Sequence, residues 1–223
     1  MERGLLGGCS MKAFWLSCFL IPLLAVTGRG ALYTFSPTPT DMYDLDHHSA
    51  YTWRVDNVNL GGLSITGATL TFTNIRNWDS NPNMLFIHLL DTAKHSGVRS
   101  FLDATGVPVP SAQIQDNFAG SLFNSNPLVK STTGNTLLAN PSFGMTPTTF
   151  KIEFSLAQLA ILQNYIGNGN NFAFGFDPDC HFYNSGITFQ LRTGQAVPDN
   201  SSTAFLLLFA ASGVGYLKYK FAA

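Results

Sequence analysis

The stretch TFKIEF, from Thr149 to Phe154, alternates strictly between apolar and polar side chains. Because successive side chains of an extended chain point to opposite sides, this pattern predicts a β-strand that buries one face and exposes the other. The side chains expected on the buried face are Phe150, Ile152 and Phe154. A half-buried strand of this kind is typical of an antiparallel sheet that packs against a second layer.

Similar patterns recur elsewhere in the chain. ITFQLR (Ile187–Arg192) and ATLTFT (Ala68–Thr73) each place apolar residues on one face. MLFIHLL (Met84–Leu90) is apolar on both faces, as expected of a strand in mid-sheet. Tyr51–Val55 and Asn171–Phe176 complete the stronger candidates. The predicted core residues are Phe150, Ile152, Phe154, Phe174, Ile187, Phe189 and Leu191. Turns rich in Asn, Gly and Pro separate these strands and predict an all-β fold, a two-sheet antiparallel β-sandwich of jelly-roll-like form.

One short helix is expected directly after the first stretch. Ser155 begins SLAQLAILQNYIG, Gln158 follows three residues later as in a capping box, and Gly167 is placed to end the helix. We expect this helix to cover one open end of the sandwich. The stretch from Asp103 to Thr148 is rich in Asn, Ser, Pro, Gly and Thr, which indicates long loops with at most one short strand.

The composition indicates a single domain over residues 32–196, long enough to bury its own core. This domain carries seven Lys and Arg against eleven Asp and Glu, a net charge of −4. Without a basic patch, nucleic acid is not expected as a partner. Cys180 is the only cysteine of the domain, so it cannot form an internal disulfide, and the stability must come from the core.

Residues 1–31 have the pattern of a secretory signal peptide. Arg3 and Lys12 supply positive charge, the apolar run Ala13–Val26 follows, and small residues up to Ala31 offer a site for signal peptidase. A plain membrane anchor is the alternative, but the run is short for a membrane span and ends in small residues.

Residues 197–223 form a second hydrophobic segment, VPDNSSTAFLLLFAASGVGYLKYKFAA. Its apolar run, Ala204–Leu217, would span only about 20 Å as a helix, short of a hydrocarbon core of about 30 Å. Lys218 and Lys220 would hold the end of the chain on the cytoplasmic side. The segment therefore predicts a transmembrane helix that anchors the exported chain transiently, and a permanent single-span anchor stays open as the alternative.

This tail resembles the PEP-CTERM class of bacterial sorting signals, in the variant that begins Val-Pro-Asp-Ser-Gly. The residues that correspond to the motif and its polar spacer are Val197, Pro198, Asp199, Ser201, Ser202 and Thr203. Asn200-Ser201 stands where that variant has Ser-Gly, and two lysines replace its arginine cluster. The resemblance implies that an exosortase recognises the tail, and that the protein passes from the inner membrane to the cell envelope or an extracellular matrix.

Two segments rich in Asp and His, residues 41–48 and 177–184, are the candidate site. Closely spaced aspartates in a loop can present several oxygens to a hard cation, and exported proteins meet calcium at high concentration. The candidate calcium ligands are Asp177, Asp179, Asp44 and Asp46. If the two segments meet in the folded chain, the alternative is a zinc site. Its ligands would be Cys180, His181, His47 and His48.

The favoured alternative to any ion site is a turn. Asp-Pro favours extended backbone, Asp and Asn side chains bond to nearby main chain, and Asn184-Ser185-Gly186 reverses the chain. On this interpretation Phe176–Asn184 is the loop of a hairpin that joins NFAFGF to ITFQLR.

No catalytic motif is evident in the domain. The chain has no G-x-S-x-G, and Glu153 is the only glutamate between residues 32 and 196. His88 lies in an apolar strand, where a hydrogen-bonded core histidine is expected rather than a base. We therefore predict a non-enzymatic structural or binding role in the envelope.

A secreted carbohydrate-binding module is the alternative function, with an extracellular polysaccharide as the partner. Such modules stack sugars on exposed aromatic rings. The candidate rings are Trp53, Trp78, Tyr33, Tyr43, Tyr51 and Tyr183. Trp78 is the one expected to be exposed, because it lies in the polar stretch NIRNWDSNPN.

Overall fold

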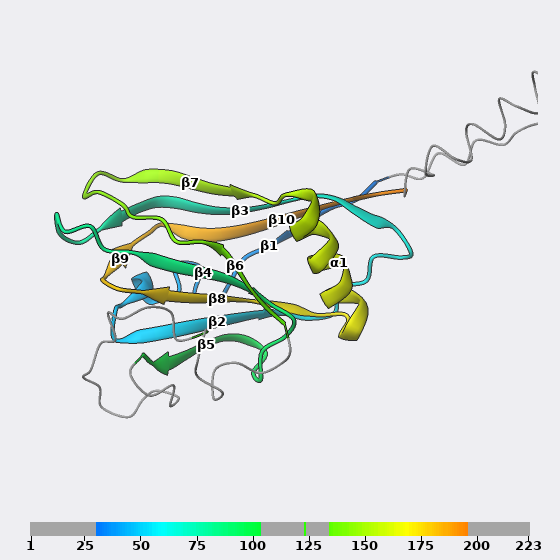
Figure 1. Ribbon diagram of the computed structural model, residues 1–223, viewed down its shortest axis with the longest axis horizontal. Helices are drawn as coiled ribbons and strands as arrows, with labels where there is room; N and C mark the ends of the chain where they lie inside the picture. Colours follow the sequence, from blue (N-terminus) through cyan, green and yellow to red (C-terminus); the bar gives the residue numbers. More distant parts are fainter. Residues whose placement is uncertain (1–29, 104–122, 124–133, 196–223) are drawn as a thin grey trace, which may run out of the picture.

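The computed structural model describes residues 30–103, 123 and 134–195, which form two antiparallel sheets packed face to face (Figure 1). One sheet has the order β1-β10-β3-β7, with β9 paired to β3, and the other has the order β5-β2-β8-β4-β6. The elements are β1 (Leu32–Phe35), η1 (Tyr43–Leu45), β2 (Ser49–Val55), β3 (Ser64–Asn77), β4 (Leu85–Leu90), β5 (Gly97–Leu102), β6 (Asn135–Ala139), β7 (Thr148–Glu153), α1 (Leu156–Gly169), β8 (Phe172–Pro178), β9 (Phe182–Tyr183) and β10 (Gly186–Gly194).

The predicted all-β, two-sheet sandwich is confirmed. Apart from β5 and β9, the strands follow the jelly-roll order. The first strand, β1, pairs with the last strand, β10. The chain crosses from one sheet to the other between β1 and β2, and again between β3 and β4. β1 pairs with β10 from Leu32 opposite Arg192 to Phe35 opposite Phe189. The predicted signal segment up to residue 29 and the predicted sorting motif, Val197 to Thr203, lie outside the described residues.

The core between the sheets is built largely from aromatic side chains. Phe189 packs its ring 5.0 Å from that of Phe174 and 5.3 Å from that of Phe172, measured between ring centroids. Six of the seven predicted core residues are buried, and Phe150 packs against the core while partly exposed. His88 is buried, and its Nδ1 lies 2.7 Å from Oδ1 of Asn135, as expected of a hydrogen-bonded core histidine.

A second apolar cluster covers the outer face of the β5-β2-β8-β4-β6 sheet. Its members are Ala50, Leu90, Ala93, Phe101, Phe123 and Ala173. Phe123 is fully buried there, and a Cβ atom at Gly175 would lie 2.8 Å from its ring, so glycine makes room for this contact. Both faces of this sheet are therefore covered, which is why β2 and β8 are almost entirely buried.

The helix begins as predicted. The Ser155 side chain accepts from the Gln158 backbone N–H, and the Gln158 side chain accepts from the Ser155 N–H, which completes the capping box. The helix runs past Gly167 and ends at Asn170, whose left-handed backbone (φ 55°) provides the cap, so the predicted end is wrong by about one turn. Figure 1 shows α1 lying across one end of the two sheets.

The sandwich therefore has two distinct ends. We call "tail end" the end formed by residues 30–31, 56–63, 154–171 and 194–195, where α1 and both described chain ends at residues 30 and 195 lie (Figure 1). We call "loop end" the opposite end, formed by residues 36–48, 78–84, 140–147 and 178–185. β10 runs the length of one sheet between them, and its nine residues extend over about 30 Å.

The predicted hairpin between β8 and β10 is wrong. β8 pairs with β2 and β4 in one sheet, whereas β10 pairs with β1 and β3 in the other. Residues 178–185 are therefore a crossover between the sheets at the loop end, and β9 within it adds to the end of β3. A hairpin and a crossover have the same turn residues, so local sequence does not distinguish them.

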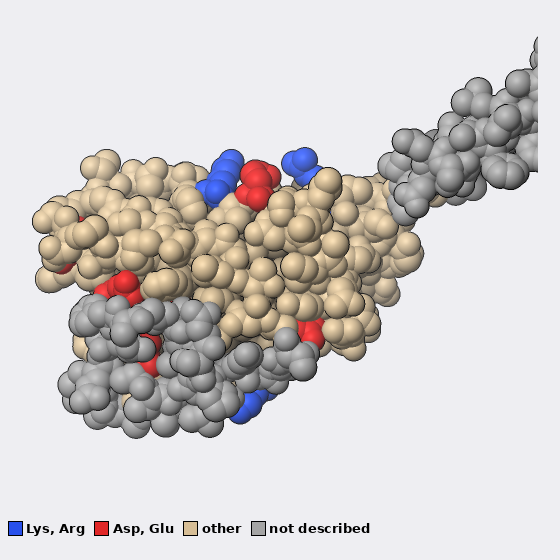
Figure 2. Space-filling view, viewed as in Figure 1, with Lys and Arg blue, Asp and Glu red and all other residues tan. Residues whose placement is uncertain are grey.

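Charged side chains are few on the face seen in Figure 2, and they are scattered over it.

No helix among the described residues is long and apolar enough to cross a membrane.

Candidate functional site

The two predicted Asp/His segments are neighbours at the loop end. The side-chain amide of Asn184 donates to the carbonyl oxygen of Asp41 at 2.8 Å. The backbone N–H of Asn184 donates to Oδ1 of Asp44 at 3.3 Å. The crossover is also bonded to the loop after β3, because the Trp78 N–H donates to the carbonyl oxygen of His181 at 3.0 Å. The crossover therefore holds the first segment in place.

An unusual turn precedes the histidines of the first segment. Four consecutive residues, Met42 to Leu45, have left-handed backbone with φ between 47° and 61°, and none is glycine. This conformation costs about 1–2 kcal/mol for each residue with a side chain. Met42 and Leu45 are fully buried in the core, so apolar packing offsets the strain. The turn directs Asp46, His47 and His48 away from the core.

Asp46, His47 and His48 form a compact cluster. Oδ1 of Asp46 lies 3.1 Å from Nδ1 of His48 and 3.7 Å from Nδ1 of His47. It also accepts a hydrogen bond from the backbone N–H of His48 at 3.2 Å. The two imidazole rings are 3.9 Å apart between centroids. In the part of the chain that the structure describes, these three residues are the only group of His, Cys, Asp and Glu close enough together to share one metal ion.

The electrostatics of the cluster favour an ionised carboxylate beside neutral imidazole. Burial raises the pKa of Asp46, but the hydrogen bonds from His48 and the nearby imidazoles outweigh burial and lower the pKa below its usual value. Burial lowers the pKa of His47, and the neighbouring His48 and His181 lower it further against the effect of Asp46. Neutral imidazole is the form that binds metal ions.

The four candidate calcium ligands are divided between different environments. Asp177 is only 3% exposed, within β8. Asp179 is partly buried, and burial raises its pKa to about 6, helped by the nearby Asp103 and opposed by a hydrogen bond from the Met84 backbone. Asp44 accepts from Asn184, and only Asp46 belongs to the compact cluster. The calcium site stays a prediction.

Cys180, from the alternative zinc set, is buried in the core between the sheets. His47 and His48 of that set lie together in the cluster, and His181 is near enough to influence the pKa of His47. The structure thus groups two histidines of the set, keeps His181 outside that group, and buries the cysteine among apolar residues of the core.

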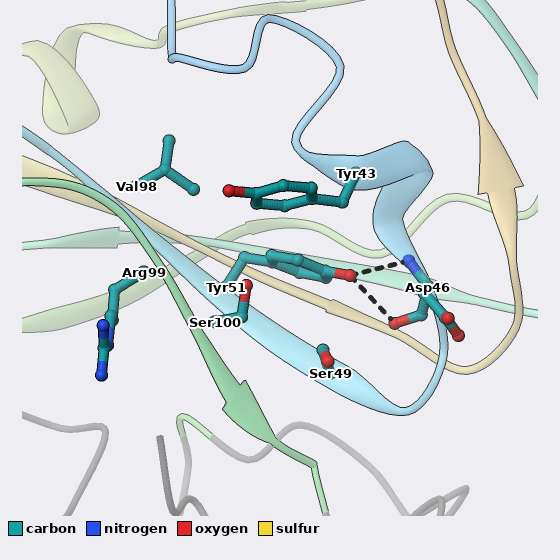
Figure 3. Close-up of a pocket in the computed structure, with 7 residues that line it drawn as sticks. All are labelled: Tyr43, Asp46, Ser49, Tyr51, Val98, Arg99 and Ser100. Atoms are coloured by element: carbon teal, nitrogen blue, oxygen red, sulfur yellow. Dashed lines mark hydrogen bonds between the residues drawn. The ribbon is translucent and has the colours of Figure 1, made fainter. Parts of the chain in front are cut away.

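A pocket of about 400 Å³ opens beside the cluster (Figure 3). Its lining residues are Tyr43, Asp46, Ser49, Tyr51, Val98, Arg99 and Ser100. Figure 3 shows the rings of Tyr43 and Tyr51 one above the other. The Tyr51 hydroxyl accepts from the Asp46 backbone N–H at 2.9 Å, and burial raises the pKa of this phenol above its usual value. The volume is in the range of small-ligand sites.

The predicted exposure of Trp78 is confirmed, since the residue is 58% exposed, and Tyr43 is 60% exposed. Both rings belong to the loop end. Trp53 and Tyr51 are buried, because both faces of β2 are covered, and this removes them as stacking platforms. The sequence did not predict the pocket, since β5 lies opposite η1 only in the folded chain.

Comparison with known protein families, curated proteins and solved structures finds no match to this chain. The site must therefore be interpreted from its own geometry.

Proposed function

We propose that this chain is an exported, non-enzymatic protein of the bacterial cell envelope. Its C-terminal tail would direct it to the envelope, and its loop end would be the surface that binds a partner. The tail would be processed by an exosortase-type enzyme after signal peptidase has removed residues 1–31. The protein would then pass from the inner membrane to the envelope or the extracellular matrix.

The observation that carries the proposal is the position of the two chain ends. After removal of residues 1–31, β1 begins at the new N-terminus, and its first residue, Leu32, lies opposite Arg192 near the end of β10. Residue 195, where the tail is attached, follows β10 directly. The new N-terminus and the attachment point of the tail therefore both lie towards the tail end, about 30 Å from the polar loop end.

Replacing Val197-Pro198-Asp199 with three alanines tests the sorting step. We expect the variant to accumulate in the inner membrane, because the sorting enzyme no longer recognises the tail. A matched control places three alanines at Ser80-Asn81-Pro82 of the loop end, and this control should be delivered normally. Normal delivery of the tail variant would contradict the sorting signal and would mean that the tail is an ordinary membrane anchor.

Carbohydrate binding is a second candidate function, and it is favoured by the exposed ring of Trp78 and by the exposed ring of Tyr43, which lines the pocket. Aromatic rings with polar neighbours are how many sandwich domains hold sugars. The test is sedimentation of the protein with insoluble polysaccharides, compared with Trp78→Ala and with a Tyr33→Ala control. Binding that survives Trp78→Ala, or no binding to any polysaccharide, would contradict this candidate.

A further inference from the structure

We propose that Asp46, His47 and His48 form a binding site for one transition-metal ion of the zinc class. The site belongs to the loop end and does not depend on how the chain is exported.

The positions of the side chains already approach the geometry of such a site. Two ligands of a tetrahedral zinc ion, each about 2.0–2.1 Å from the metal, lie about 3.3 Å from one another. The distances from Oδ1 of Asp46 to Nδ1 of His48 and of His47 are 3.1 and 3.7 Å, on either side of that value. One ligand atom from each of the three residues lies within 4.8 Å of the other two. Small side-chain rotations would therefore close the cluster on an ion.

Two buried imidazole nitrogens, one in the cluster and one on the crossover, have no hydrogen-bond partner among the described residues. Nδ1 of His47 is shielded from solvent and has no hydrogen-bond partner among the described residues. The same holds for Nε2 of His181, on the crossover. A buried polar atom without a partner costs folding free energy, and a metal ion would satisfy the lone pair of His47.

The donor atoms select the class of ion. The cluster offers two imidazole nitrogens and one carboxylate, a set that suits zinc and its first-row neighbours. Calcium prefers six to eight oxygen ligands, and here Asp46 is the only carboxylate of the group. The hydrogen bond from the His48 backbone to Oδ1 of Asp46 fixes the carboxylate, which is the support that metal ligands commonly have.

The experiment uses the full-length chain, purified in detergent with a tag that contains no histidine. Titration with zinc sulfate, followed by calorimetry, should give one ion per chain. Titration with Co²⁺ should give the strong visible bands of a four-coordinate ion and no thiolate-to-cobalt band, because Cys180 is not among the ligands. Asp46→Asn, His47→Gln and His48→Gln should each weaken binding by at least about 100-fold, more than loss of a supporting residue does.

Two variants serve as controls for folding and for the ligand set. His95→Gln changes an exposed histidine that does not belong to the cluster, and it should leave the Kd for zinc unchanged. Cys180→Ser should also retain binding, and circular dichroism of each variant checks that the fold persists. The proposal is overturned if zinc does not bind at millimolar concentration, if the three cluster variants bind as tightly as the original chain, if Cys180→Ser abolishes binding, or if calcium displaces zinc at equal concentration.

Discussion

The tail end and the loop end of the sandwich are built by different means. The tail end has regular elements: a helix with a complete capping box, and the paired ends of β1 and β10, where Leu32 lies opposite Arg192. The loop end contains a left-handed turn of four residues, the partly buried Asp179 and two exposed aromatic rings. Backbone strain and buried polar groups are tolerated where the rest of the fold is stable enough to hold them. The difference is the one that the proposed function requires, in which the tail end would serve attachment and the loop end would serve binding.

The largest expected effect comes from the core that supports both ends. Phe189→Ala should lower the free energy of unfolding by about 3–5 kcal/mol, since it removes a buried ring and leaves a cavity. The ring of Phe189 contacts those of Phe35, Phe154, Phe172 and Phe174. Urea denaturation measures the change. A loss below about 1 kcal/mol would mean that the ring is not in the core.

A smaller effect tests the strain at the loop end directly. Tyr43→Gly should raise the free energy of unfolding by about 0.5–1 kcal/mol, because glycine adopts a left-handed backbone without strain. The matched control at the tail end is Leu32→Gly, a residue that is 57% exposed in a regular strand. This control should lower the free energy of unfolding by about 0.5–1 kcal/mol. Equal losses in both variants, in the same urea experiment, would contradict a strained turn.

The smallest effect concerns Asp179. Burial raises the pKa of this carboxyl to about 6 in the folded protein, well above its usual value, so the folded state holds its proton more strongly than the unfolded state. Stability should therefore fall as pH rises from about 4 to 6, and the full penalty should remain above that range. Asp179→Asn should raise Tm at pH 8 by no more than about 2–4 °C and leave it unchanged at pH 3.

Thermal melts at the two pH values check this prediction, and repeating them with calcium adds a second comparison. A Tm that rises with calcium in the original chain, but not in Asp179→Asn, would support the calcium site in place of a simple burial penalty. Equal effects of the substitution at pH 3 and pH 8 would show that the titration of Asp179 is not the cause.

The sequence predicted the regular half of the structure better than the loop end. Alternation identified β7, β10 and the middle of β3, and Ser155 with Gln158 identified the start of α1, since these signals are local. β1 and β5 were not predicted, because their sequences, LYTF and GVRSFL, alternate weakly.

At the loop end, the Asp/His residues were predicted as candidates, but their grouping was not. Nothing local marks Met42 to Leu45 as left-handed, because glycine is absent and the conformation depends on burial of Met42 and Leu45. The crossover that brings His181 to His47 depends on which sheet each strand joins. The sheet that each strand joins is determined by packing between distant segments, and a single sequence does not show this packing.

The most direct test of the division between the two ends is thiol labelling on cells that export the protein. Ser80→Cys places a thiol at an exposed position of the loop end, and Ala160→Cys places one on the exposed face of α1 at the tail end. We expect a small membrane-impermeant maleimide to label Ser80→Cys on intact cells several-fold faster than Ala160→Cys, and to label both at equal rates once the protein is solubilised in detergent. Faster labelling at Ala160→Cys, or no labelling of either variant before lysis, would contradict an exported protein attached at its tail end with its loop end presented for binding.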